Sequence, residues 1–203
     1  MFSWNTADMR DRLELVYRRA MDDIPEAYHS ASWYQRQSKW IRKVATEYDI
    51  ESEVVAGMVA VMSPQVTWEQ QVNWTPRVLD QLAHGEKNPT ALNHPGFITN
   101  KTKAFRIYES RDPESILSGP KVTAFWSNLC GNLRPVTVDT HMVDAALGLR
   151  SISDREGIGT LTDHRYRCIA EAVTAIAASS SSFEPAEVQA IIWTYRRDSQ
   201  ETM

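Results

Sequence analysis

Residues 117–141 read LSGPKVTAFWSNLCGNLRPVTVDTH, and this stretch contains two predicted helix starts. Gly119 followed by Pro120 suits the first of them, because proline fits the first turn of a helix, where its missing N–H is not needed. An extended piece that begins at Pro135 leads to Asp139, whose carboxylate can cap the second helix. The stretch therefore predicts a hairpin, a helix, a short link and another helix.

Lys121 and Asp139 stand at these two helix starts, 18 positions apart. A helix N-terminus offers backbone N–H groups to a phosphate, and its dipole disfavours a lysine that has no other role. An amine and a carboxylate brought together in a pocket can attack a sugar anomeric carbon and stabilise the positive charge that develops there. We therefore predict Lys121 and Asp139 as a catalytic pair. Capping of the helix by Asp139 is compatible with this role.

The rest of the chain also has helical patterns, so the predicted fold class is all-α. Thr6 is the expected cap of the first helix, and Pro25 is expected to end that segment. The apolar run at 54–61 predicts a buried helix, because its Ala and Met content disfavours a strand. The predicted helices cover 6–21, 30 or 32 to 48, 51–62, 67–84, 100–109, a short turn of helix near 112–118, 121–130, 139 or 140 to 147, 163–178 and 185–197. Loops are expected at 85–96 and 151–159.

The net charge of −4 and the pI of about 5.8 argue against a protein that coats nucleic acid without specificity. The stretch 100–134 is locally basic, however, which allows one face to bind DNA. The expected phosphate contacts in it are Lys101, Lys103 and Arg134.

Two cysteines, Cys130 and Cys168, are too few for a four-cysteine zinc or iron–sulfur site, so we expect no metal and no cofactor. The first 17 residues alternate polar and apolar side chains, unlike a secretory signal. No apolar run approaches the ~20 residues of a membrane span. These features predict a cytoplasmic protein that does not bind membranes, and we expect it to be a monomer.

Three segments resemble the helix-hairpin-helix DNA glycosylase superfamily, which includes endonuclease III. The family pattern is a hairpin Leu-Pro-Gly-Val-Gly-x-Lys-Thr-Ala followed by Val-Asp-Thr-His, matched here by Lys121 and by residues 138–141, with the same spacing from Lys to Asp. The family segment Leu-Ser-Ala-Gln-Ala-Thr is similar to Met62–Thr67. Gly-Leu-Tyr-Asn-Ser-Lys-Ala is loosely similar to the segment from Gly96 to Ala104. The resemblance covers roughly residues 50 to 195.

This resemblance implies a two-lobed helical fold forming a single domain over 1–203. Residues 51–130 would form one lobe, with the hairpin near 117–121, and residues 131–203 would complete the second lobe; residues 1–50 have no place in the pattern. The resemblance also implies that Gln65 fills the gap left by a flipped base. Gly119 and His141 would belong to the DNA-binding site. The chain departs from the family at Leu117, which stands where the hairpin's first glycine is expected.

Three functions remain open from the sequence. The first is a DNA glycosylase, with or without lyase activity, that flips a nucleotide out of the duplex. The second is a phage DNA hypermodification transferase that installs an amino acid or amine on an activated 5-hydroxymethyluracil base. The third is a non-catalytic DNA-binding module, since helix-hairpin-helix motifs often only grip the backbone.

Overall fold

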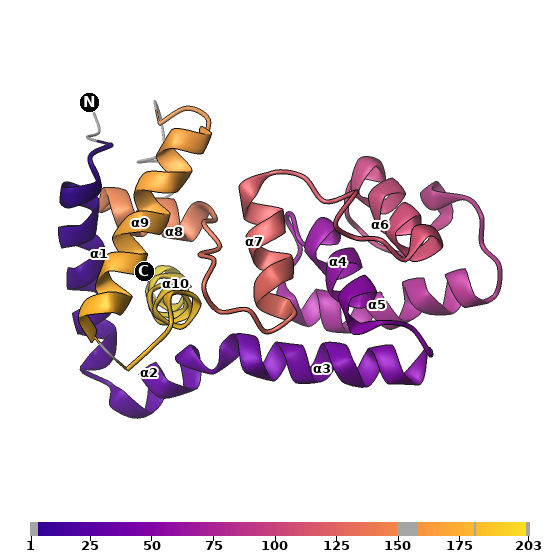
Figure 1. The fold of residues 1–203 in the computed structure, drawn as a ribbon, viewed down its shortest axis with the longest axis horizontal. Coiled ribbons are helices and arrows are strands. Elements are labelled where there is room, and N and C mark those ends of the chain that lie inside the picture. The colour runs from indigo at the N-terminus through magenta and orange to yellow at the C-terminus, as the bar shows by residue number, and fades with distance from the viewer. Residues whose placement is uncertain (1–3, 150–157, 181, 202–203) are drawn as a thin grey trace. The chain divides into compact units, whose positions relative to one another are not determined.

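A computed structural model describes residues 4–149, 158–180 and 182–201, and these residues are all-α, as the sequence predicts, with no strand among them. The expected loop at 151–159 lies mostly outside these ranges. Figure 1 labels the helices along the chain. Their bounds are α1 Thr6–Met21, α2 Ile24–Ala31, α3 Trp33–Glu47, α4 Ser52–Met62, α5 Trp68–Ala83, a 3-10 turn η1 at Pro89–Ala91, α6 Ile98–Ser110, α7 Pro120–Leu129, α8 Thr140–Leu147, α9 Asp163–Ser180 and α10 Pro185–Glu201.

The chain divides into two compact units. Unit 1 contains residues 1–36 and 131–203, and unit 2 contains residues 37–130. The first and last helices, α1 and α10, therefore belong to unit 1. Residues 4–36, most of the segment without a place in the family pattern, contribute to its packed core.

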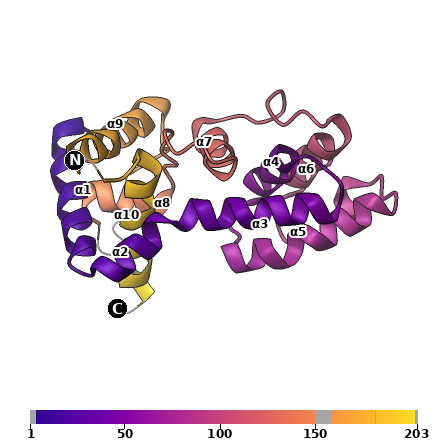
Figure 2. The ribbon, with the colours of Figure 1, turned by 60° about the horizontal axis from the view of Figure 1, so that its bottom comes forward.

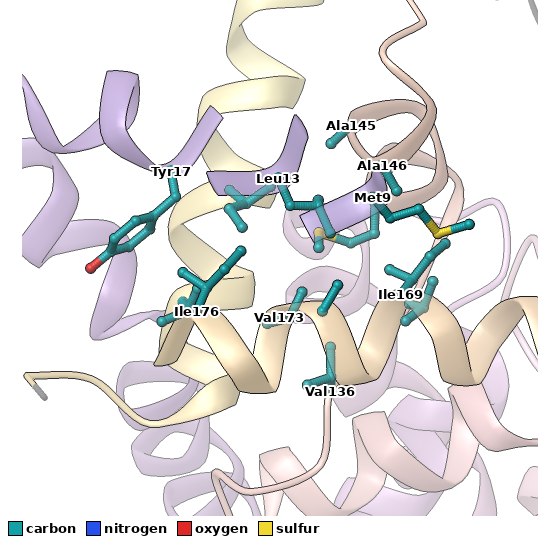
Figure 3. Close-up of a cluster of buried hydrophobic side chains, with 14 of the residues drawn as sticks. Met9, Leu13, Tyr17, Val136, Ala145, Ala146, Ile169, Val173 and Ile176 are labelled. Atoms are coloured by element: carbon teal, nitrogen blue, oxygen red, sulfur yellow. The ribbon is translucent and has the colours of Figure 1, made fainter. Parts of the chain in front are cut away.

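Unit 1 is built around α10, which packs against α1, α2, α8 and α9. Figures 1 and 2 both show α10 lying among these four helices. Met9 and Leu13 of α1 are fully enclosed, and they face Ile169 and Val173 of α9, as Figure 3 shows. Burying one such side chain stabilises the fold by roughly 1.5–3 kcal/mol. The core thus fixes α8, the helix that begins after Asp139.

Unit 2 is built around α4, whose residues from Val54 to Met62 are all buried, as the apolar run predicts. This helix packs against α6, α7 and α5. The part of α3 that belongs to unit 2, together with Tyr48 just after it, braces the neighbouring helices. The Ser38 hydroxyl donates to the Leu129 carbonyl at the end of α7 (2.7 Å), and the Tyr48 hydroxyl donates to the Asp80 carboxylate on α5 (2.7 Å).

Two predictions about the first helices are wrong. Asn5, not Thr6, caps α1, because the Asn5 side chain accepts from the N–H of Ala7 (2.8 Å). Pro25 does not end a helical region but lies in the first turn of α2, a helix that the sequence analysis missed. Proline is tolerated there because the first N–H groups of a helix have no partner within the helix. The Asp23 carboxylate caps α2 by accepting from the N–H of Glu26 (3.4 Å).

Candidate active site

The hairpin before α7 depends on the backbone of Gly119. This residue has φ 85°, a conformation that favours glycine, although a side chain at this position would meet no atom within 4 Å. Pro120 then begins α7, and no side chain caps the helix. The hairpin and the start of α7 therefore form as the sequence predicts, with an uncapped helix N-terminus.

Lys121 is the second residue of α7 and is half-buried. In the part of the chain that the structure describes, its ammonium group has no hydrogen bond and no ion pair. The neighbouring lysine on α6 behaves differently, because Lys103 Nζ donates to the Ser118 hydroxyl in the hairpin (2.9 Å). Lys103 thus braces the hairpin, whereas Lys121 has no such partner among the described residues.

The segment before the hairpin forms only one turn. The N–H groups of Ile116 and Leu117 both donate to the carbonyl of Pro113, at 3.0 and 2.9 Å. The predicted short turn of helix is therefore a single hydrogen-bonded turn, and the structure shows no full helix between α6 and Gly119. In this respect the hairpin differs from a motif with a complete helix on each side.

Gln65 lies in a tight turn that follows α4. The N–H of Val66 donates to the carbonyl of Ser63 (3.2 Å), with Pro64 and Gln65 between them. Gln65 is exposed and has φ 63°, a left-handed conformation that costs energy for a residue other than glycine. The amide side chain is therefore held on the surface by a strained backbone.

The turn at Gln65 and the hairpin lie at the same end of two packed helices. The indole N–H of Trp126 in α7 donates to the carbonyl of Glu53 at the start of α4 (3.0 Å). In Figure 1 the two helices run side by side in opposite directions, so the end of α4 faces the start of α7. Gln65, Gly119 and Lys121 thus belong to one region of unit 2.

Asp139 caps α8 and has a second partner. Its Oδ1 atom accepts from the N–H of Met142 (3.0 Å), which confirms the predicted cap. Its Oδ2 atom accepts from Nε1 of Trp193 on α10 (2.8 Å). Both oxygens of the carboxylate are therefore held by donors, and the side chain is half-buried.

Tyr166 fixes the extended link that leads to Asp139. Its hydroxyl donates to the carbonyl of Val136 (2.6 Å) and accepts from the N–H of Val138 (3.3 Å). Burial raises the pKa of Tyr166 to about 12, so the hydroxyl keeps its proton at neutral pH. A single side chain of α9 therefore satisfies two backbone groups of the link and sets its path.

The remaining predicted residues have different surroundings. His141 is half-buried, its Nδ1 atom has no partner, and its ring meets the Trp193 ring edge-on at 6.2 Å between centroids. Arg134 is exposed, and its guanidinium forms no ion pair with the described residues. Lys101 Nζ donates to the carbonyl of Leu92 (2.9 Å), which ties α6 to the loop before it. The structure thus gives Lys101 a structural partner.

The site residues fall into two groups. Lys121, Gln65 and Gly119 belong to unit 2 together with Lys101 and Lys103, whereas Asp139, His141 and Arg134 belong to unit 1. Within the described ranges, no group of three or more His, Cys, Asp or Glu side chains is arranged to hold a metal ion. The sequence analysis missed Trp193, because no short spacing connects it to Asp139.

The chain matches the Family of unknown function (DUF7178) over residues 2–200. It belongs to this family. No curated protein and no solved structure matches the chain. None of the described helices is both long enough and apolar enough to cross a membrane.

Proposed function

We propose that this protein acts on the bases of DNA as a glycosylase, with Lys121 as nucleophile and Asp139 as the carboxylate that stabilises positive charge. The proposal rests on the surroundings of the Lys121 and Asp139 side chains. The amine of Lys121 is unpaired at an uncapped helix start behind a left-handed glycine, and Asp139 is held rigidly at another helix start. A lysine at the first of these helix starts and an aspartate at the second are the two groups that the resemblance implies as a catalytic pair.

The reaction begins when the nucleotide leaves the base stack. The neutral amine of Lys121 attacks C1′ of the sugar while the bond from C1′ to the base breaks, and the base leaves with the electron pair and takes up the proton that Nζ loses. The electron pair on Nζ then forms a double bond to C1′ as the bond from C1′ to O4′ breaks. O4′ takes up a proton from water to become a hydroxyl, and a Schiff base joins Nζ to C1′. Asp139 stabilises the positive charge on the sugar during the attack.

Other features of the two units support binding to DNA. Gln65 is exposed on a strained turn at the same end of unit 2 as the hairpin, and strain of this kind is concentrated at functional sites. Lys103 and Lys121 add positive charge near the hairpin, which favours a phosphate backbone. The two helical units also support the two-lobed arrangement that the resemblance implies.

Borohydride trapping tests the proposal, because the hydride reduces a Schiff base to a stable amine. The full chain is incubated with duplexes that contain uracil, 5-hydroxymethyluracil, an oxidised pyrimidine or an abasic site. We expect a covalent protein–DNA adduct on at least one duplex, and no adduct with Lys121→Ala. Lys43→Ala is the matched control, since this exposed lysine forms an ion pair with Glu47 (3.7 Å) and should trap normally.

Mass spectrometry of the nucleosides separates the other functions. An abasic site supports the glycosylase. A heavier base after reaction with phosphorylated 5-hydroxymethyluracil DNA and an amine would instead identify the transferase. DNA binding that survives Lys121→Ala and Asp139→Asn, with no adduct and no changed base on any duplex, would contradict an enzymatic role and favour the binding module.

A further inference from the structure

Trp193 forms a contact with Asp139 that helix capping does not require. The bond from the N–H of Met142 to Oδ1 is sufficient to cap α8. The bond from Trp193 Nε1 to Oδ2 comes from a different helix, 54 positions later in the chain. Together the two bonds therefore fix the orientation of the carboxylate, including its rotation about the Cβ–Cγ bond.

The indole of Trp193 is itself held by three neighbours. The Trp33 ring lies 5.9 Å away between centroids, at 59°. The Arg197 guanidinium stacks over the indole at 4.7 Å, and the His141 ring meets it edge-on. Aromatic and cation–π contacts of this kind are attractive. The donor thus has a fixed position before any DNA binds.

An indole N–H suits this role chemically. It donates one hydrogen bond and has no acceptor, so it cannot exchange a proton with the carboxylate. A donor of this kind sets the direction of the lone pairs on the Asp139 carboxylate. Because charge stabilisation depends on placement to within about 1 Å, such a contact affects turnover more than binding.

We infer that Trp193 is a positioning residue for Asp139, fixed in turn by Trp33, His141 and Arg197. The inference rests on the proposed function, in which the Asp139 carboxylate stabilises charge on the sugar. Trp193 touches neither the sugar nor the base in this assignment. It acts only through the carboxylate that it holds, so its effect should disappear when that carboxylate is removed.

A double-mutant cycle tests this dependence. Trp193→Phe keeps an aromatic ring but removes the N–H, and we expect turnover to fall about 10–100-fold, the range for groups that orient a reacting residue, with DNA affinity within about twofold of the original protein. In the Asp139→Asn background the same change should cause no further loss. Trp74→Phe is the matched control, because this indole lies on α5 of unit 2 and stacks with Arg77. Unchanged turnover in Trp193→Phe, or an equal loss in both backgrounds, would overturn the inference.

Proton NMR of the indole groups separates this inference from the proposed function. The Trp193 Nε1–H resonance is assigned by its absence in Trp193→Phe. We expect it to shift in Asp139→Asn while the other indole resonances stay in place. A resonance that does not shift overturns the positioning role whatever the activity. A resonance that shifts in a protein inactive on every duplex overturns the proposed function but supports the contact.

Discussion

Gly57, in the middle of α4, lies directly against Pro113 in the turn before the hairpin. A β-carbon at position 57 would come within 2.8 Å of the Pro113 β-carbon and 3.5 Å of Ile107. Glycine in a helix interior costs about 1 kcal/mol relative to alanine. The chain retains it here because the absence of a side chain lets the turn approach α4. The position of this turn then determines where Gly119 and Lys121 lie.

The first prediction concerns this contact. Gly57→Ala should destabilise the protein by about 1–3 kcal/mol, because the added methyl group forces the turn away from α4 in a packed core. The gain in helix propensity offsets only part of this loss. Urea unfolding measures the free energy of unfolding. Under the proposed function the DNA affinity should also fall as the hairpin moves, and a gel-shift titration measures it.

The change Pro113→Gly provides the control. It removes the β-carbon that the new methyl group would meet, so the double variant with Gly57→Ala should regain part of the DNA affinity. A Gly57→Ala protein that melts at the original temperature and binds DNA normally would show that the close approach is unimportant.

The helix ends could be predicted wherever residues close together in the sequence mark them. Thr67 and Gln70 form a capping box at the start of α5, with bonds of 3.3 and 2.9 Å, where the predicted helix over 67–84 begins. The prediction that Pro25 ends a helical segment is wrong because a proline marks either the end of one helix or the first turn of the next. Only the side chain of Asp23, which accepts from a backbone N–H in that turn, decides between them.

The candidate site was predictable only in part, for a similar reason. The start of α7 after Gly119 and the cap at Asp139 depend on neighbouring residues, and the structure confirms both. The DNA-binding role of Gly119 stays a prediction. Trp193 reaches Asp139 through the packing of α10 against α8, which no spacing along the sequence encodes. The left-handed backbone of Gln65 was also missed, because such turns favour glycine or asparagine at this position.

The second prediction concerns the strain at Gln65. Gln65→Gly should stabilise the protein by up to about 1 kcal/mol, because glycine adopts a positive φ without the cost that other residues incur. The same change removes the side chain proposed to fill the gap left by the flipped base, so DNA affinity and turnover should both fall. Thermal unfolding and single-turnover kinetics measure the two effects.

Gln65→Ala is the matched comparison, since it removes the amide but keeps the strained backbone. It should lose activity like the glycine variant while its melting temperature stays near the original. Single-stranded substrates should be spared in both variants, because they leave no gap to fill. Full activity in both variants would contradict the role of Gln65.

The third prediction is a loss of stability in weak acid caused by His94. This histidine is buried, and its Nδ1 atom accepts from the N–H of Gly96 (2.9 Å). Burial, with a smaller effect of the Lys101 charge, lowers the pKa of His94 to about 4. Below pH 6.5 the unfolded chain binds a proton that the folded protein does not, so stability falls as the pH falls from 6.5 towards 4.

The size of this effect can be isolated with His94→Gln, which cannot titrate. The free energy of unfolding of the original protein should fall by about 2 kcal/mol more than that of the variant between pH 7 and pH 5, at about 1.4 kcal/mol per pH unit below about 6.5. Urea unfolding at each pH measures the difference. Parallel pH profiles for the two proteins would refute the assignment to His94.

The last prediction separates the two hydrogen bonds of Asp139 by their effects on stability. Asp139→Asn has one oxygen for two donors, so its amide NH2 must face either Met142 or Trp193, and we expect a loss of about 1–3 kcal/mol. Trp193→Phe removes one of these donors, so it should cost less in the Asp139→Asn background than it costs alone. Asp139→Ala loses both acceptors and should be the least stable of the single variants. Urea unfolding of the three single variants and the double variant measures these differences. Additive losses would mean that the indole and the carboxylate do not interact.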